Sequence, residues 1–429
     1  MKRLWVLIAV CFVDMIGLMI IAPLLTPYAR RFGAADWIVG LLFSAFAIAQ
    51  LVSSPIWGRV SDRYGRRPVL LVGLGGSAIA YVIFGFANSL WLLFFCRIVQ
   101  GLGGGTTGVA QAYVADTMEP AERAKALGWL SAATSAGVSI GAVIGALARN
   151  LGVAAPGLVA AGLVIINMVF AWQWLPESRV PPPHVAAPGG GFLPPKTPRP
   201  VAHALWEVIR HPGRPASQMI WIYAVGMLAL NSVIGVLSLY LIDSFGFTEK
   251  NLGYVFTVFS VVGVVLRIGP VGWVNARFGE VRTLRLGATL MVLGLTLLPF
   301  PKVFSLFVVC LLLVPAGTAF LFPATSSLVS QRTDRHELGL TMGVQQTFRG
   351  IMAIVGPIGA TLVYETLGHG VPFWIAAGTM AVALMLSSQV RHAPVAEPAL
   401  QGAEKREGRS TRPLHSRSSL FQHPAGLLL

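Results

Sequence analysis

The chain has 429 residues; 55% of them are hydrophobic, only 11% are charged, and the formal net charge is +15. Soluble domains carry about 25% charged residues, so this composition excludes a soluble protein, whose surface it would leave without polar cover. In a soluble chain the positive charge would indicate nucleic-acid binding, but here it collects in loops between apolar runs. We therefore expect a membrane protein that has the lipid bilayer as a partner and binds no nucleic acid.

Apolar runs of about 20 residues, the length that a helix needs to cross ~30 Å of hydrocarbon, recur along the chain. They predict spans near residues 4–25, 37–57, 68–87, 90–113, 125–149, 153–174, 217–242, 251–275, 282–300, 303–330, 340–366 and 371–390. The runs are continuously apolar, whereas the strands of an outer-membrane barrel would alternate over ~10 residues. The expected fold class is an all-α membrane protein with about twelve transmembrane helices.

Basic residues lie mostly on one side of these spans, in loops that include Lys2, Arg3 and the cluster at 59–67. Positive loops stay in the cytoplasm, so both termini are expected there, in a bacterial-type inner membrane. The first apolar run is too long for a signal peptide, and Pro23 and Pro27 stand where a cleavage site would be. We therefore keep it as the first span.

Composition divides the chain into four parts. Residues 1–175 and 217–390 each hold six predicted spans and form two expected bundles. Residues 176–216 are rich in Pro and Gly and are expected to be a cytoplasmic linker. Residues 391–429 are polar and basic, and a disordered cytoplasmic tail is expected there.

The two halves share a sequence pattern. A shift of 213 residues maps Phe32, Gly33 and Gly40 onto Phe245, Gly246 and Gly253. A shift of 214 maps Gly58, Arg63 and Gly65 onto Gly272, Arg277 and Gly279. A shift of 215 maps Gly128 and Gly141 onto Gly343 and Gly356. The preserved order indicates a diverged duplication. Two pseudo-symmetric six-helix bundles are a transporter architecture with its site near the middle of the membrane.

The strongest local signal is the segment GRVSDRYGRRP, which follows the second span. Its distinctive residues are Gly58, Asp62, Arg63, Gly65, Arg66, Arg67 and Pro68. Gly65 permits a tight turn between two helices, and Pro68 suits the first turn of the next helix. This segment resembles the cytoplasmic loop signature of the major facilitator superfamily.

The resemblance implies that the loop is a conformational latch. In the family the acid at the position of Asp62 caps a helix of the other half, and a loop Arg pairs with an acid that ends the fourth span. Asp116 is the candidate for that acid here. The second-half copy has Ala276 in place of Asp62, so the latch is expected to be asymmetric.

The fourth span contains Arg97-Ile-Val-Gln100-Gly101, which matches the buried-Arg motif of the superfamily. An Arg inside a span is expensive and should face the protein interior or a water-filled cavity. Arg97 and Gln100 share a helical face and are candidates for the substrate cavity. The nearby GLGGGTTG run follows no strand, so we interpret it as close helix packing rather than a dinucleotide loop.

A glycine motif associated with antiporters occurs in the fifth span. Its residues are Gly128, Gly137, Gly141 and Gly145. The proline that usually follows the third glycine is Ala142 here, which weakens the indication of antiport. Small residues at this spacing predict close helix packing whatever the direction of transport.

Asp14 is the acid expected deep in a span. It lies ~16 Å beyond Arg3 along a helix, close to the midplane. Desolvation disfavours a charged carboxylate, so Asp14 is expected to exchange protons with either side as the cavity alternates. The alternative is a structural Asp that is hydrogen-bonded to a neighbouring span.

The second half supplies the remaining cavity candidates, Asn231, Gln345 and Arg349, together with Arg267 in the eighth span. Gln345 and Arg349 are four residues apart and share a helical face. Arg349 is expected either to bind an anionic substrate group or to balance Asp14. A snorkelling or packing role is an equal alternative.

The resemblance covers about residues 4–390 and is closest, in the first half, to the twelve-span drug–proton antiporter branch, which includes tetracycline exporters. VDMIGLMIIAPLLTPYAR, the 58–68 loop, YVADTMEPAERAKALGWL and the fifth-span glycines carry it. It implies the major facilitator fold and a monomer that exports small amphipathic compounds against protons by alternating access. Ala80 stands where tetracycline exporters carry an acid, which argues against tetracycline–metal exchange.

Two other classes of function stay open. One is a symporter or facilitator for a nutrient or an anionic metabolite, and the more remote one is a membrane sensor or enzyme. The spans hold no paired carboxylates, metal-ligand cluster or Ser/His/Asp set, so no catalytic residue, metal or cofactor is expected. The three cysteines, Cys11, Cys96 and Cys310, all fall in spans and predict no disulfide.

Overall fold

A computed structural model describes residues 2–119, 122–178, 201–333 and 337–388, and every regular element in them is a helix. The predicted all-α fold is therefore confirmed. The first half contains α1 (Lys2–Ile21), η1 (Ala22–Leu24), α2 (Leu25–Arg31), α3 (Asp36–Tyr64), α4 (Arg66–Gly85), α5 (Leu90–Gly104), α6 (Thr107–Thr117), α7 (Arg123–Arg149) and α8 (Ala155–Trp174).

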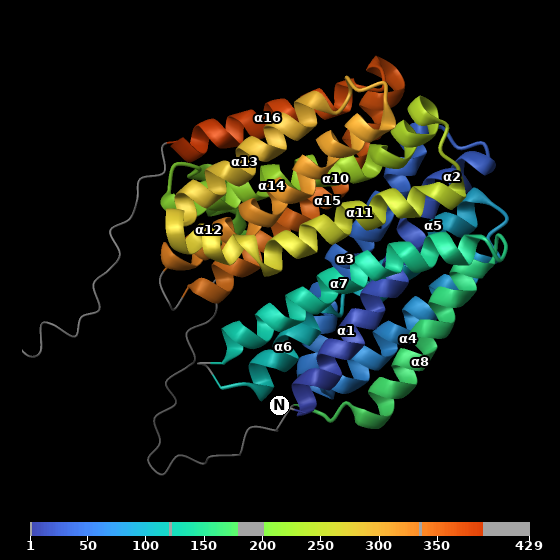
Figure 1. Cartoon of the computed structure of the whole chain (residues 1–429). Helices are drawn as coiled ribbons and strands as arrows, with labels where there is room; N and C mark the ends of the chain where they lie inside the picture. Colours follow the sequence, from blue (N-terminus) through green and yellow to red (C-terminus); the bar gives the residue numbers. More distant parts are fainter. Residues whose placement is uncertain (1, 120–121, 179–200, 334–336, 389–429) are drawn as a thin grey trace, which may run out of the picture. The chain divides into compact units, whose positions relative to one another are not determined.

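The second half contains α9 (Val201–Arg210), α10 (Pro215–Phe245), α11 (Glu249–Ile268), α12 (Pro270–Phe278), α13 (Glu280–Leu297), α14 (Phe304–Gln331), α15 (Leu338–Leu367) and α16 (Val371–Ser388). In Figure 1 the first-half helices, coloured blue to green, gather on one side, and the second-half helices, yellow-green to red, gather on the other. The expected tail, 391–429, and residues 179–200 of the expected linker lie outside the described residues.

Ten of the described helices are long and apolar enough to cross a membrane. The fourth predicted span falls short of that length because it is divided: α5 ends at Gly104 and α6 begins at Thr107. The run of glycines there weakens a continuous helix. The ninth predicted span, α13, has 18 residues and carries Glu280, Arg282 and Arg285 in its first two turns.

Glycines that the sequence repeat relates adopt related conformations. Gly33 and Gly246 have φ angles of 73° and 66°, and Gly65 and Gly279 have φ angles of 102° and 79°. Glycine adopts positive φ without the steric penalty of a Cβ. The turns after α2 and α10, and those after α3 and α12, are therefore built alike, as a duplication predicts.

The halves contact each other directly through α3 with α15 and α7 with α11. A Cβ at Gly40 would stand 2.6 Å from the Pro357 carbonyl oxygen, and one at Gly253 would stand 2.6 Å from Cβ of Ala146. Farther along α3, the Ser44 hydroxyl donates to the Ile354 carbonyl at 2.7 Å. Small residues thus let helices from opposite halves approach at backbone distance.

These contacts belong to one end of the helices. We call the end that carries Arg66 and Arg67 the basic end, and the end that carries Arg30 the opposite end. Toward the basic end, a Cβ at Gly58 on α3 or Gly343 on α15 would meet no heavy atom within 4 Å. Among the described residues, the ion pairs that join the halves, those of Arg30 with Asp243 and of Arg31 and Arg149 with Glu249, lie at the opposite end.

Candidate functional site

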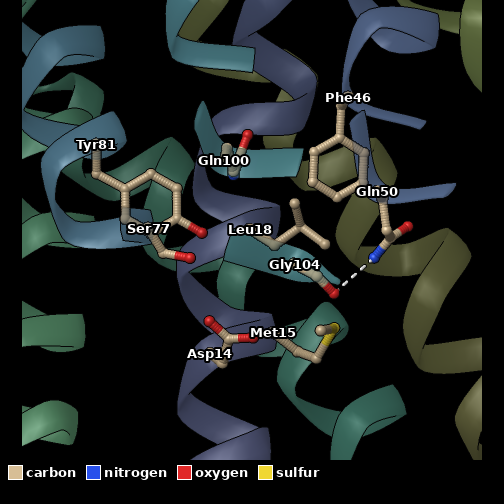
Figure 2. A pocket seen from close by; sticks show the side chains of 9 residues that line it. All are labelled: Asp14, Met15, Leu18, Phe46, Gln50, Ser77, Tyr81, Gln100 and Gly104. Atoms are coloured by element: carbon tan, nitrogen blue, oxygen red, sulfur yellow. Dashed lines mark hydrogen bonds between the residues drawn. The ribbon is translucent and has the colours of Figure 1, made fainter. Parts of the chain in front are cut away.

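A small pocket, about 20 Å³ in volume, with polar and apolar walls lies among four helices of the first half (Figure 2). Its lining residues are Asp14, Met15 and Leu18 of α1, Phe46 and Gln50 of α3, Ser77 and Tyr81 of α4, and Gln100 and Gly104 of α5. The Gln50 amide donates to the Gly104 carbonyl at 3.0 Å, at the point where α5 ends. The break in the fourth predicted span therefore supplies part of the pocket wall.

Asp14 places its carboxylate in this pocket (Figure 2). In the described part of the chain, no Lys, Arg or His lies within ion-pair distance of it, and no hydrogen bond holds it. The alternative of a structural Asp bonded to a neighbouring span therefore finds no support in this structure. An unpaired carboxylate within a span is an unstable arrangement that protonation relieves.

Arg97 lies beside the pocket and is almost fully buried, with 3% of its surface exposed. Its guanidinium donates to the side-chain oxygen of Gln100 and to the Leu42 carbonyl. It also stands over the ring of Phe46, 4.5 Å from the centroid. Neutral acceptors and an aromatic face thus stabilise this cation, as cation–π geometry allows in a desolvated site.

Gln100 has one unsatisfied group. Its side-chain oxygen accepts from Arg97, whereas its amide nitrogen Nε2 is buried and has no hydrogen-bond partner among the described residues. A buried donor without a partner destabilises the protein by about 1–3 kcal/mol. Because Gln100 lines the pocket, a ligand or water that accepts a hydrogen bond there would recover that energy.

The second-half candidates lie apart from this pocket. The Asn231 amide donates to Met227 of its own helix at 2.8 Å, and the buried Gln345 amide donates to Ser326 Oγ at 3.2 Å. Arg349 is exposed and donates to Gln346 at 3.3 Å. The structure therefore brings Asp14, Arg97 and Gln100 together, and it leaves Asn231, Gln345 and Arg349 in the other half.

The loop motif is organised within the first half. Arg66 Nε lies 3.0 Å from Asp116, and Arg66 Nη1 lies 2.7 Å from Asp62. Asp62 is 63% exposed and makes its ion pair inside its own half, so the contact with the other half that the family resemblance implied is not formed here. Arg63 stacks on Tyr64, and Arg67 donates to the Trp172 carbonyl.

Glu177 is a loop residue that the sequence analysis missed. Its two carboxylate oxygens accept from the backbone N–H groups of Arg66 and Arg67, at 2.8 and 3.1 Å. These are the first N–H groups of α4, so Glu177 caps that helix from the end of the first half. The only signal in the sequence was an acid just after the sixth span.

Three of the fifth-span glycines form a tight seam with α1. A Cβ at Gly137, Gly141 or Gly145 would stand 2.4 to 2.6 Å from the carbonyl oxygens of Phe12, Ile16 and Ile20. Gly128 has open space at its Cβ position instead, because it precedes Gly137 by nine residues and therefore lies on the opposite face of α7. Close packing thus holds for three positions of the motif and fails for the fourth.

Charged residues at the opposite end join the halves, and the sequence analysis missed them too. Arg30 pairs with Asp36 of its own half and with Asp243 of the other half, at 2.8 and 2.6 Å. Glu249 of the second half accepts from Arg31 and Arg149 of the first. Tyr364, Trp37 and Glu365 add hydrogen bonds at the same end.

Comparison with known proteins gives the family. The family model described as Major Facilitator Superfamily matches residues 7–269 and 219–429. The chain is 26% identical over 371 residues to the tetracycline resistance protein, class B, of Escherichia coli, which covers 86% of this chain and 89% of that protein. It is 28% identical over 394 residues to multidrug resistance protein 2 of Bacillus subtilis (strain 168), covering 89% and 93%.

A solved structure shows the same fold. The human organic anion transporter MFSD10 (TETRAN) aligns with a TM-score of 0.68 and 20% sequence identity, over 90% of this chain and 99% of that chain. With the helical architecture and the match to the family over most of the sequence, this establishes a multi-pass membrane transporter rather than an enzyme. The chain belongs to the Major Facilitator Superfamily.

Proposed function

We propose that this chain exports small amphipathic compounds in exchange for protons, and that Asp14 carries the proton. The observation that carries the proposal is the unpaired Asp14 carboxylate in a pocket within the spans. A proton neutralises that carboxylate when water is excluded from the pocket, and the carboxylate releases the proton when the pocket opens to a side of lower acidity.

The walls of the pocket have the chemistry of an amphipathic site, although in this structure the pocket, about 20 Å³ in volume, has room only for water. Phe46, Tyr81, Met15 and Leu18 supply apolar surface, and the free amide donor of Gln100 supplies a polar contact. Pockets for small molecules combine a mostly apolar lining with a few placed polar groups. The names of the relatives, tetracycline resistance and multidrug resistance proteins, support export as the direction.

Alternating access would use the two ends of the molecule in turn. Under the positive-inside rule the basic end faces the cytoplasm, so both termini lie there, and this structure would be open toward the cytoplasm. Opening to the other side would require the Arg30–Asp243 contact to part and the halves to meet at the basic end. Asp62, exposed in this structure, would then be in a position to reach the second half.

Substrate-driven proton movement tests the proposal. The protein is reconstituted as the full chain in liposomes with an internal pH dye, a pH gradient is imposed, and amphipathic cations and organic anions are added in turn. Export against protons predicts that amphipathic compounds dissipate the gradient. If no compound moves protons, the proposal of proton coupling is wrong, and the protein is a facilitator that moves its compound down a gradient.

A second candidate is uptake of an anionic metabolite. It is favoured by Arg267 and Arg349, which have no carboxylate partner in the described part of the second half. The same liposomes decide between the two, because uptake would move protons and a metabolite in the same direction. Accumulation inside right-side-out vesicles would support uptake, and extrusion would support export.

A further inference from the structure

A histidine lies beside the charged contact that joins the halves at the opposite end. His369 stands in the loop between α15 and α16, and its side chain is exposed. Its ring stacks on that of Tyr364, with the ring centroids 4.5 Å apart and the planes 6° from parallel. Gly368, just before it, has a φ of 113°, which favours glycine and turns the chain sharply. The other histidines of the described residues, His203 and His211, lie at the basic end.

The same phenol contacts the ion pair between the halves. The Tyr364 hydroxyl donates to Asp243 Oδ2 at 2.8 Å, and Arg30 binds both oxygens of that carboxylate, at 2.6 and 2.8 Å. His369, Tyr364 and Asp243 belong to the second half, whereas Arg30 belongs to the first. Tyr364 therefore touches the imidazole with its face and the carboxylate with its hydroxyl, so a positive charge on His369 attracts Asp243.

The two members of the ion pair differ in what they keep when the halves part. Arg30 also binds Asp36 of its own half, at 2.8 Å, and that partner moves with it. Among the described residues, Asp243 has no second cation within ion-pair distance, and the neutral hydroxyl of Tyr364 is what remains beside it. Opening thus leaves Asp243 with an uncompensated charge, which is unfavourable at a partly buried position.

A proton on His369 supplies a replacement charge. Histidine is the side chain whose charge ordinarily changes between pH 5 and 8. While the opposite end is closed, Arg30 neutralises Asp243 and repels a second cation. Once the end is open, Asp243 stands alone and attracts one. His369 therefore binds a proton more tightly in the open state, and by linkage a falling pH favours opening.

The other charged groups around the imidazole leave this direction unchanged. Asp36 departs together with Arg30, and its charge acts on the Tyr364 phenol more weakly than that of Arg30 does. Glu365, the neighbour of Tyr364 on α15, accepts a backbone N–H of the first half at 3.0 Å and loses that donor on opening, which also favours a nearby cation. Lys302, in the loop after α13, is exposed to solvent.

We propose that His369 is a proton-binding site on the outer side of the protein, and that a proton there opens the opposite end by replacing Arg30 as the cation beside Asp243. The proposal rests on the proposed function for its orientation, in which the opposite end faces away from the cytoplasm. It adds to Asp14 a second proton site, which controls access and does not carry the proton across. An acidic outer solution would thereby turn the protein toward the protons that it exchanges.

Spin-label distances across the opposite end test this. Labels at Leu151 of the first half and Ser305 of the second occupy exposed positions at that end, outside the charged cluster. Double electron–electron resonance is recorded on the full chain in phosphatidylcholine nanodiscs at about pH 7.5 and about pH 5.5, a range above the ordinary titration of carboxylates. We expect the population with the longer distance to rise about threefold at the lower pH, as expected for one partly exposed charge contact.

Two substitutions of the same residue separate its charge from its stacking. His369→Gln should abolish the response to pH, whereas His369→Arg, which stays positively charged, should show the enlarged open population already at pH 7.5. His211→Gln, at an exposed position of the basic end, is the matched control and should respond as the wild type does. A wild type that does not open at pH 5.5, a His369→Gln protein that still does, or a His369→Arg protein that stays closed at pH 7.5 would each overturn the proposal.

A further variant distinguishes this site from the proposed proton carrier. Asp14→Asn should keep the response to pH, because its side chain lies in the first-half pocket, away from the opposite end. Loss of the response in Asp14→Asn together with its retention in His369→Gln would assign the effect to Asp14 and overturn the proposal. Proton-coupled export is measured separately in liposomes, so coupling can fail while the outer site stands, and the two failures are distinguishable.

Discussion

Arg30 and Asp243 occupy equivalent positions in the two halves, 213 residues apart, and pair with each other through two hydrogen bonds of 2.6 and 2.8 Å. The same shift relates Asp36, the second partner of Arg30, to Glu249, which accepts from Arg31 and Arg149. The three ion pairs between the halves, Arg30–Asp243, Arg31–Glu249 and Arg149–Glu249, thus use acids whose positions the shift of 213 relates to Arg30 and Asp36. Because paired Arg–carboxylate contacts are strong and directional, this cluster holds the opposite end closed.

The first prediction concerns that closure. Asp243→Asn should increase the time that the opposite end spends open, because it removes the charge that Arg30 of the other half binds. Both side chains are about a quarter exposed, so we expect an effect of about 1 kcal/mol, or several-fold in population. Spin-label distances across the opposite end, measured by double electron–electron resonance, check this.

A double-mutant cycle provides the control. Arg30→Gln should act in the same direction, and combining the two substitutions should give less than the sum of their effects, since they remove one contact. Strict additivity would show that the two residues act independently and would contradict the role assigned to the pair.

The second prediction compares two glycines of one helix. Gly141→Ala should destabilise the protein by about 1–3 kcal/mol, because its Cβ would stand 2.5 Å from the Ile16 carbonyl oxygen and force α1 away from α7. Gly128→Ala should be neutral or slightly stabilising, because its Cβ meets open space and alanine favours a helix. Thermal unfolding in detergent measures the stability of both variants. Equal melting temperatures would contradict the close packing of Gly141 against α1.

The third prediction concerns the cap on α4. Glu177→Gln should weaken the two bonds to the backbone N–H groups of Arg66 and Arg67 and cost about 0.5–2 kcal/mol. Hydrogen exchange in the first turn of α4 should become faster. Glu119→Gln, at an exposed loop position, should not change it. An unchanged rate of hydrogen exchange in the Glu177 variant would show that Glu177 does not cap α4.

The fold followed from the sequence because long apolar runs and membrane thickness leave few alternatives. The divided fourth span did not, since the predicted span 90–113 passes through the glycines at 103–105 without a charged residue, and only the local geometry shows that α5 stops at Gly104. Hydropathy detects composition, and a break at a cluster of glycines depends on what packs beside it. Here that neighbour includes the Gln50 amide, which binds the Gly104 carbonyl.

The candidate site was predictable in part. Asp14, Arg97 and Gln100 could be identified because polar groups within spans are costly and stand out. The role of Glu177 could not, because it depends on where the chain after α8 meets the first N–H groups of α4. Arg30 and Asp243 looked like ordinary charges at span ends, although the shift of 213 that relates Gly33 to Gly246 also relates these two.

The most direct test of the central claim separates exchange from proton coupling in one variant. Asp14→Asn protein in liposomes should still exchange labelled for unlabelled compound across the membrane. The amide is neutral, so no proton has to bind at this position before the halves alternate. The variant should not accumulate the compound in response to a pH gradient, whereas Glu119→Gln should accumulate it as the wild type does. Gradient-driven accumulation by Asp14→Asn at the wild-type rate would contradict the account.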